Sequence, residues 1–137
     1  MKRKIFITIL LVCITLSTTT LFSQFKNTRG YVAGIITIRT DSAGGFIYSP
    51  AVGYTVKIYL VPIQNIQGVT LPDELVATKY TDINGTYAYY VLPSDYPTSI
   101  FSHVYIEVMG PVGYGKSPNY IYTYDNIPID LIISSGT

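Results

Sequence analysis

The chain has 137 residues, of which 48% are hydrophobic and only 12% are charged. This length fits one domain, and the hydrophobic share, to which fourteen tyrosines contribute, argues against an intrinsically disordered chain. Nine basic residues are balanced by eight acidic ones, which excludes the strongly basic proteins that bind nucleic acid or anionic lipid.

The first 23 residues have the pattern of a secretory signal peptide. A basic start over residues 1–4 (MKRK) is followed by an apolar run over residues 5–16. The run is shorter than the roughly 20 residues that a membrane-spanning helix needs, which disfavours the alternative of an uncleaved anchor. We place cleavage after Ser23, which removes Cys13, the only cysteine, and leaves six basic and eight acidic residues. We therefore expect an exported chain that is periplasmic, cell-surface or extracellular, without a disulfide or a transmembrane helix.

The mature chain is expected to be a flexible lead-in over residues 24–30 and one β domain over residues 31–137. Short runs rich in Ile, Val, Tyr and Thr alternate apolar with polar positions and are separated by Gly, Pro, Asn and Asp. The first strand is predicted over residues 31–39, and residues 41–45 (DSAGG) break it. The second, over residues 54–61, shows the cleanest alternation of a half-buried strand.

A tight turn is predicted between the third and fourth strands. Residues 74–81 and 86–92 are predicted strands, and the Asn-Gly dipeptide between them best tolerates the positive φ angles of a two-residue hairpin. We therefore predict that these two strands are antiparallel neighbours. The residues assigned to this structural hairpin are Asp82, Asn84, Gly85 and Tyr87.

The remaining strands are predicted over residues 100–108, 119–124 and 127–134. In the last of them every second residue is apolar, and Pro128 near its start indicates a strand end or a sheet edge. Seven short strands with turns between them, and no sustained helical period, predict an all-β fold. We expect a seven-stranded antiparallel β-sandwich.

Residues 81–89 (TDINGTYAY), followed by residues 92–93 (LP), resemble a motif of the carboxypeptidase regulatory-like domains. Those domains share the transthyretin, or prealbumin-like, sandwich and are related to Cna-B-type and starch-binding-like modules. Residues 30–32 (GYV) resemble their early Gly-x-Val strand, and residues 50–56 (PAVGYTV) resemble a second strand motif. The resemblance implies a non-catalytic accessory domain. The chain departs from the family pattern at residues 94–99, which replace a shorter turn.

Residue types that carry catalysis or bind metals are scarce. His103 is the only histidine and the mature chain has no cysteine, which leaves too few partners for a catalytic triad or a zinc centre. The turn at Asp82 resembles the start of a calcium loop, but the following residues bring no carboxylates. Asp125 and Asp130 with Glu107 form a candidate acid set of a kind that is commonplace in small proteins. We therefore predict no enzymatic activity, no cofactor and no metal site.

Tyrosine is the one enriched chemical feature. Three alternate positions in the strand over residues 119–124 share a face, and two more tyrosines are predicted to face outward elsewhere. Exposed aromatic rows form contact surfaces and stack on sugars, whereas ordinary stabilisation of a sheet is the alternative use of strand tyrosines. The predicted ligand platform consists of Tyr120, Tyr122, Tyr124, Tyr59 and Tyr105.

Two functions fit these features. The first is a secreted or surface-exposed, non-catalytic module with an accessory, adhesive or structural role, whose partner is a protein or a cell-surface component. The alternative is a carbohydrate-binding protein that uses exposed tyrosines, with a polysaccharide as its partner. No nucleic-acid partner is expected in either case.

Overall fold

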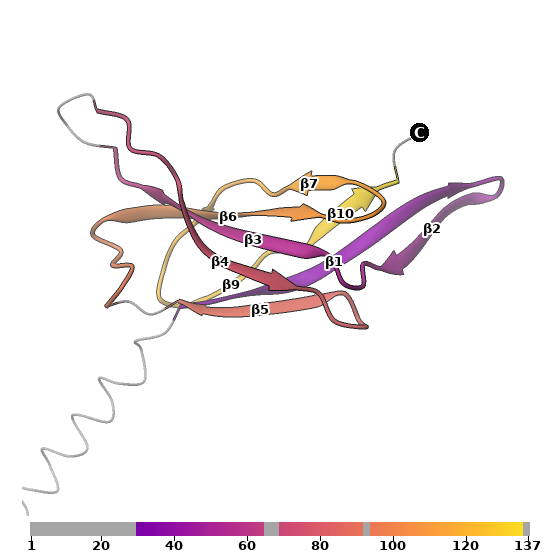
Figure 1. Cartoon of the computed structure of the whole chain (residues 1–137), viewed down its shortest axis with the longest axis horizontal. Helices are drawn as coiled ribbons and strands as arrows, with labels where there is room; N and C mark the ends of the chain where they lie inside the picture. Colours follow the sequence, from indigo (N-terminus) through magenta and orange to yellow (C-terminus); the bar gives the residue numbers. More distant parts are fainter. Residues whose placement is uncertain (1–29, 65–68, 92–93, 136–137) are drawn as a thin grey trace, which may run out of the picture.

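The computed structural model describes residues 30–64, 69–91 and 94–135, which form ten strands and no helix, arranged in two sheets (Figure 1). The predicted all-β sandwich is confirmed. The predicted signal peptide, and the lead-in apart from Gly30, lie outside the described residues. Within the described ranges, no helix is long and apolar enough to cross a membrane.

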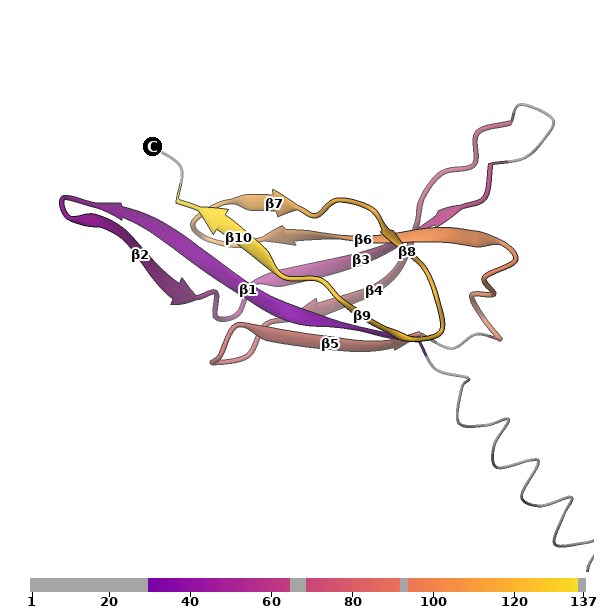
Figure 2. The ribbon, with the colours of Figure 1, turned by 180° about the vertical axis from the view of Figure 1, so that it is seen from behind.

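The first sheet is built around one long strand. The strands of this sheet are β1 (Gly30–Ser42), β2 (Gly45–Pro50), β5 (Thr86–Val91), β9 (Asn126–Pro128) and β10 (Leu131–Ser134). One side of β1 pairs antiparallel with β5 along its first half and with β2 along its second half. The other side pairs with β9 and then β10, both in parallel (Figure 2). The expected purely antiparallel arrangement is therefore corrected at the end of the chain, because alternation predicts which face of a strand is buried and not the direction of its partner.

The second sheet is antiparallel throughout. Its strands are β3 (Thr55–Pro62), β4 (Glu74–Tyr80), β6 (Phe101–Met109), β7 (Tyr114–Lys116) and β8 (Tyr120–Ile121). The strand order is β4-β3-β6-β7, and β8 pairs with the first half of β6. The sequence prediction missed β2 and β7, and it made β8 too long.

The core lies between the two sheets and consists mainly of apolar positions that alternation predicts, with Tyr122 as an exception. Strands β3 and β6 each contribute three alternate residues, because successive side chains of a strand point to opposite faces. The largest fully buried side chains are Val32, Ile36, Val56, Ile58, Leu60, Val91, Val104, Ile106, Val108, Ile129 and Ile133.

The turn after β4 crosses from one sheet to the other, so the predicted hairpin between β4 and β5 is wrong. The backbone N–H of Tyr54 donates to Oγ1 of Thr81 at 2.8 Å, which holds the end of β4 on the second sheet. The N–H of Ile36 donates to the carbonyl of Gly85 at 2.8 Å, which holds the turn on β1. Gly85 has φ +74°, and a Cβ there would lie 2.5 Å from the Ile36 carbonyl oxygen. The Asn-Gly dipeptide therefore predicted the position of a tight turn correctly. It did not predict that the strands on either side of the turn belong to different sheets.

The last predicted strand is split where the chain passes β1 at Gly34. A Cβ on Gly34 would lie 1.9 Å from the Ile129 carbonyl oxygen, so the two backbones approach more closely than side chains allow. The N–H of Ile129 donates to the carbonyl of Ala33 at 2.9 Å, and Oδ1 of Asp130 accepts from the N–H of Ile35 at 2.8 Å. The Asp130 side chain thus takes the place of a backbone acceptor between β9 and β10.

Candidate binding surface

The three tyrosines predicted as a row near β8 lie within the fold. Tyr122 is buried and its hydroxyl donates to the Tyr96 carbonyl at 2.8 Å; burial, followed by neighbouring tyrosines, raises the pKa of Tyr122 to about 12. The Tyr124 hydroxyl accepts from the N–H of Thr98 at 3.1 Å, and Tyr120 packs against the core. The expected exposed platform does not form from these three rings; Tyr122 and Tyr124 instead form hydrogen bonds with the loop before β6.

The turn residues also have structural contacts. The Asp82 carboxylate accepts from the N–H groups of Asn84 and Thr86, both at 2.9 Å, and from the Thr86 hydroxyl at 2.5 Å. The Thr86 hydroxyl is the main cause of the lowered pKa of Asp82. Tyr87 is buried and its hydroxyl donates to the Ile129 carbonyl at 2.8 Å; burial raises the pKa of Tyr87.

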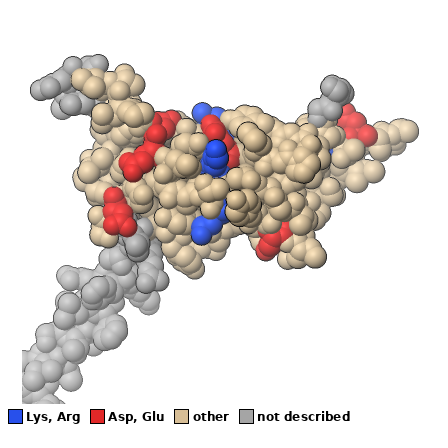
Figure 3. All heavy atoms as spheres, viewed as in Figure 1, with Lys and Arg blue, Asp and Glu red and all other residues tan. Residues whose placement is uncertain are grey.

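A different set of side chains gathers on the outer face of the second sheet. In antiparallel strands, residues at partner positions point to the same side, and the partners here are Tyr59 with Tyr105 and Glu107 with both Lys57 and Lys116. Figure 3 shows basic and acidic atoms side by side over the middle of this face. We name it the tyrosine face and define it as Lys57, Tyr59, Asp73, Tyr105, Glu107, Tyr114 and Lys116.

The centre of the tyrosine face is a stack of rings. The Tyr59 and Tyr105 ring centroids lie 5.1 Å apart at an interplanar angle of 10°, and Nζ of Lys116 lies 4.2 Å from the Tyr105 centroid. The Tyr105 hydroxyl donates to Oδ2 of Asp73 at 2.9 Å; desolvation and then this bond raise the pKa of Tyr105. Tyr105 therefore points outward, as predicted, but is only 5% exposed because its neighbours cover it.

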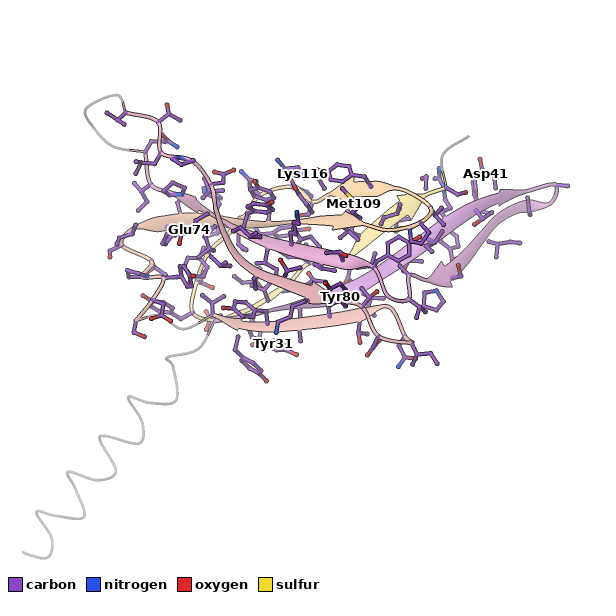
Figure 4. All side chains as sticks on the ribbon, in the orientation of Figure 1. Tyr31, Asp41, Glu74, Tyr80, Met109 and Lys116 are labelled. Carbon is purple, nitrogen blue, oxygen red and sulfur yellow. The ribbon has the colours of Figure 1, made fainter. Side chains whose placement is uncertain are left out.

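A hollow of about 250 Å³ lies beside the stack. It is lined by Thr55, Lys57, Glu107, Met109 and Tyr114, and Tyr114 is 53% exposed. Desolvation and then the Glu107 carboxylate raise the pKa of Tyr114. Figure 4 shows Met109 and Lys116 along β6 and β7 on this part of the molecule. The volume is below the roughly 300–1,000 Å³ of most small-molecule pockets, which favours contact with another surface over enclosure of a ligand.

A larger hollow of about 510 Å³ lies on the outer face of the first sheet, over Ala33, Ala88 and Ile35. The carboxylate at its edge, Asp82, is already hydrogen-bonded within its own turn. Tyr31 and Tyr80 bring hydroxyls that can orient a ligand, and apart from Asp82 the lining residues bring no charged side chain. The tyrosine face combines rings, ammonium groups and carboxylates, and we regard it as the better candidate surface.

Histidine and the acids are not gathered into a metal site. His103 lies on β6 with its Nδ1 2.9 Å from Oγ of Ser102. Among the described residues, no three His, Cys, Asp or Glu side chains are placed to hold a metal ion. Of the predicted acid set, Glu107 lies on the tyrosine face and Asp130 accepts from the N–H of Ile35 in the middle of β1, in the other sheet.

Sequence reasoning found Tyr59 and Tyr105 but missed Tyr114, Lys116 and Asp73. The two residues from β7 were missed because that strand has three residues and contains Gly115, which packs closely against Leu131. Asp73 lies in a loop, where no periodicity signals its direction. The available signal was the polar residues at alternate positions of β3 and β6, Lys57 and Glu107, which share a face with Tyr59 and Tyr105.

Comparisons with known proteins give the following similarities. No protein-family model matches the chain, and no curated protein matches it. Solved structures that resemble it include the minor pilin GBS52 of Streptococcus agalactiae, with TM-score 0.46, 12% identity, and coverage of 80% of this chain and 46% of the pilin chain. A 9R-lipoxygenase from Cyanothece PCC8801 has TM-score 0.45, 10% identity and coverage of 77% and 16%. An (S)-allantoin synthase has TM-score 0.36, 12% identity and coverage of 77% and 42%.

The chain thus spans less than half the length of each of these structures. Similarities at these TM-scores carry no functional argument, and the resemblance to carboxypeptidase regulatory-like domains stays a prediction. The chain's own geometry defines the class: an all-β module of two packed sheets with an aromatic and charged outer face.

Proposed function

We propose that this protein is an exported, non-catalytic interaction module with an adhesive or structural role, and that it contacts its partner through the tyrosine face. The observation that carries the proposal is the arrangement of Tyr59, Tyr114 and Lys116 on the outside of the second sheet, around the covered Tyr105 ring. These side chains are not needed to fill the core, which lies on the opposite face of the same strands.

The chemistry of this face suits a protein partner or a cell-surface component. Tyrosine rings supply large contact area at low entropic cost and are enriched among the residues that dominate binding energy at interfaces. Lys57 and Glu107 beside the rings give the face both signs of charge, so it selects a partner by complementarity and not by net charge. The basic start and apolar run of the first 16 residues support a location outside the cytoplasm.

The test is binding of the purified protein to intact cells of the producing organism, measured with a fluorescent label over a range of concentrations. We expect saturable binding that the double variant Tyr59→Ala/Tyr114→Ala weakens at least tenfold, about 1.4 kcal/mol. The matched control is Tyr90→Ala, which removes a tyrosine of similar exposure, 58% against 53%, from the first sheet. Binding that is absent, or that the two variants reduce equally, would refute the proposed face.

A second candidate function is carbohydrate binding at the same face. The specific observation in its favour is the hollow beside Tyr114, where an exposed ring lies next to Lys57 and Glu107, groups that hydrogen-bond hydroxyls. A panel of immobilised polysaccharides, read with the same variants, separates the candidates. Binding that Tyr114→Ala abolishes and free sugar competes for supports the carbohydrate alternative, and a panel without binding eliminates it.

A further inference from the structure

The second half of β1 and the whole of β2 project beyond the rest of the molecule as a two-stranded ribbon, seen at opposite sides in Figures 1 and 2. We call residues 39–50 the β1–β2 arm. Every residue of β2 is exposed, including Phe46, Ile47 and Tyr48. In the described part of the chain β2 pairs only with β1, so its other edge has no strand beside it.

The hydrogen bond just after β2 shows which residues of this strand bond to β1 and which turn their backbone groups to the free edge. The N–H of Ala51 donates to the Ile36 carbonyl at 3.0 Å, in the register that continues along the arm. Hydrogen-bonded pairs alternate along an antiparallel ladder, so every second residue counted back from Ala51 bonds to β1. The residues between them, Phe46 and Tyr48, turn their N–H and C=O groups to the free edge. The backbone of Pro50 also faces the free edge, so its missing N–H removes no hydrogen bond to β1.

This edge is self-complementary. If a second β2 lies antiparallel to the first, with a two-fold axis at Ile47, then Phe46 of each copy faces Tyr48 of the other. Both residues present an N–H and a C=O outward, so each Phe46–Tyr48 pair exchanges hydrogen bonds in both directions. The two Ile47 side chains meet at the axis as a non-hydrogen-bonded pair, in which side chains come closest.

The arm also lacks the features that keep sheet edges apart. Edge strands are commonly protected by lysines, bulges or inward charges, yet residues 42–50 carry no charge at all. The nearest charges are Arg39 and Asp41, which pair with each other at 4.0 Å and leave the arm neutral. By contrast, edge strand β4 carries Glu74 and Lys79. A lone two-stranded ribbon is at best marginally stable in water, and pairing would convert it into a four-stranded sheet.

We propose that the β1–β2 arm is a self-association site, where β2 of a second copy of this chain pairs antiparallel through Phe46, Ile47 and Tyr48. The pairing joins the first sheets of two molecules across a two-fold axis and uses no residue of the tyrosine face. It is therefore independent of the proposed function, and either one can fail without the other.

Sedimentation or light scattering of the purified protein over a concentration series tests the pairing. We expect the average molar mass to rise towards twice that of one chain. Ile47→Lys and Ile47→Glu each place like charges at the axis and shift association at least tenfold towards higher concentration. Mixing the two variants restores association, because Lys then faces Glu. Ile132→Lys is the control, since Ile132 is 58% exposed against 57% for Ile47 but lies on β10.

Each outcome decides the proposal. Restored association in the mixture, with Ile132→Lys behaving like the unchanged protein, supports pairing at Ile47. A chain that stays monomeric at millimolar concentration overturns it, as does association that Ile47→Lys leaves unchanged. Because Ile47 is exposed, the variants should keep the circular dichroism of the unchanged protein, which shows that any loss reflects the edge.

Discussion

Removing the Tyr87 hydroxyl tests how the end of the chain is anchored to the sandwich. Tyr87→Phe keeps the buried ring but removes the donor to the Ile129 carbonyl, which then stays buried without this bond. Leaving a buried acceptor unsatisfied costs about 1–3 kcal/mol. For a domain of this size each kcal/mol corresponds to roughly 4–8 °C in Tm, so we expect a clear fall in thermal stability.

The assay is urea unfolding followed by circular dichroism and tyrosine fluorescence, since the chain contains no tryptophan. The control is Tyr90→Phe, which removes the hydroxyl of a tyrosine that is 58% exposed and should change the free energy of unfolding by less than about 0.5 kcal/mol. Equal stability of the two variants would show that the Tyr87 hydrogen bond does not anchor the segment between β9 and β10.

Three further predictions concern stability. Gly34→Ala should lower the free energy of unfolding by more than about 3 kcal/mol, because its Cβ meets backbone at 1.9 Å; Gly44→Ala, which has open space, should change the urea midpoint little. The folded pKa of Tyr122, about 12, exceeds the unfolded value of 10.0, so its contribution to stability is complete below pH 10 and declines as the pH rises towards 12. When urea unfolding is measured below and above pH 10, Tyr122→Phe should therefore lose less stability with rising pH than the unchanged protein. The folded pKa of Asp82 is lowered, so its contribution to stability is present above the unfolded value of 3.8 and is lost as the pH falls through the folded pKa. Asp82→Asn should therefore make the urea midpoint less sensitive to acid. The control Asp95→Asn, at an exposed position, should leave that sensitivity unchanged.

Much of the sandwich could be predicted because burial on one face imposes a period of two. Val56, Ile58 and Leu60 alternate with polar residues, and these are buried positions of β3. Pairing was harder to predict, since it depends on contacts between distant segments. The Asp82–Gly85 turn looks like a hairpin in sequence, but Thr81 and Gly85 are held by different sheets.

The binding surface was predictable only in part, because alternation does not say which face is inside when both are apolar. In the segment around β8, Tyr122 is buried while Ile121 is exposed, the reverse of what an exposed tyrosine row requires. Tyr59 and Tyr105 lie on the face that Lys57 and Glu107 mark as polar, but Tyr105 is only 5% exposed, so the exposed ring expected there is absent. The Tyr105 ring is covered by Asp73, which lies in a loop, and by Lys116, which lies in a three-residue strand. Local sequence patterns do not reveal either contact.

The proposed role of the tyrosine face is tested most directly by nitration of the protein, free and bound to cells, with modified tyrosines located by mass spectrometry. In the free protein we expect Tyr114 and Tyr90 to react and the buried Tyr87 and Tyr122 to be spared. On binding, Tyr114 should become protected while Tyr90 stays reactive. Protection of Tyr90 with Tyr114 still reactive would contradict the proposal.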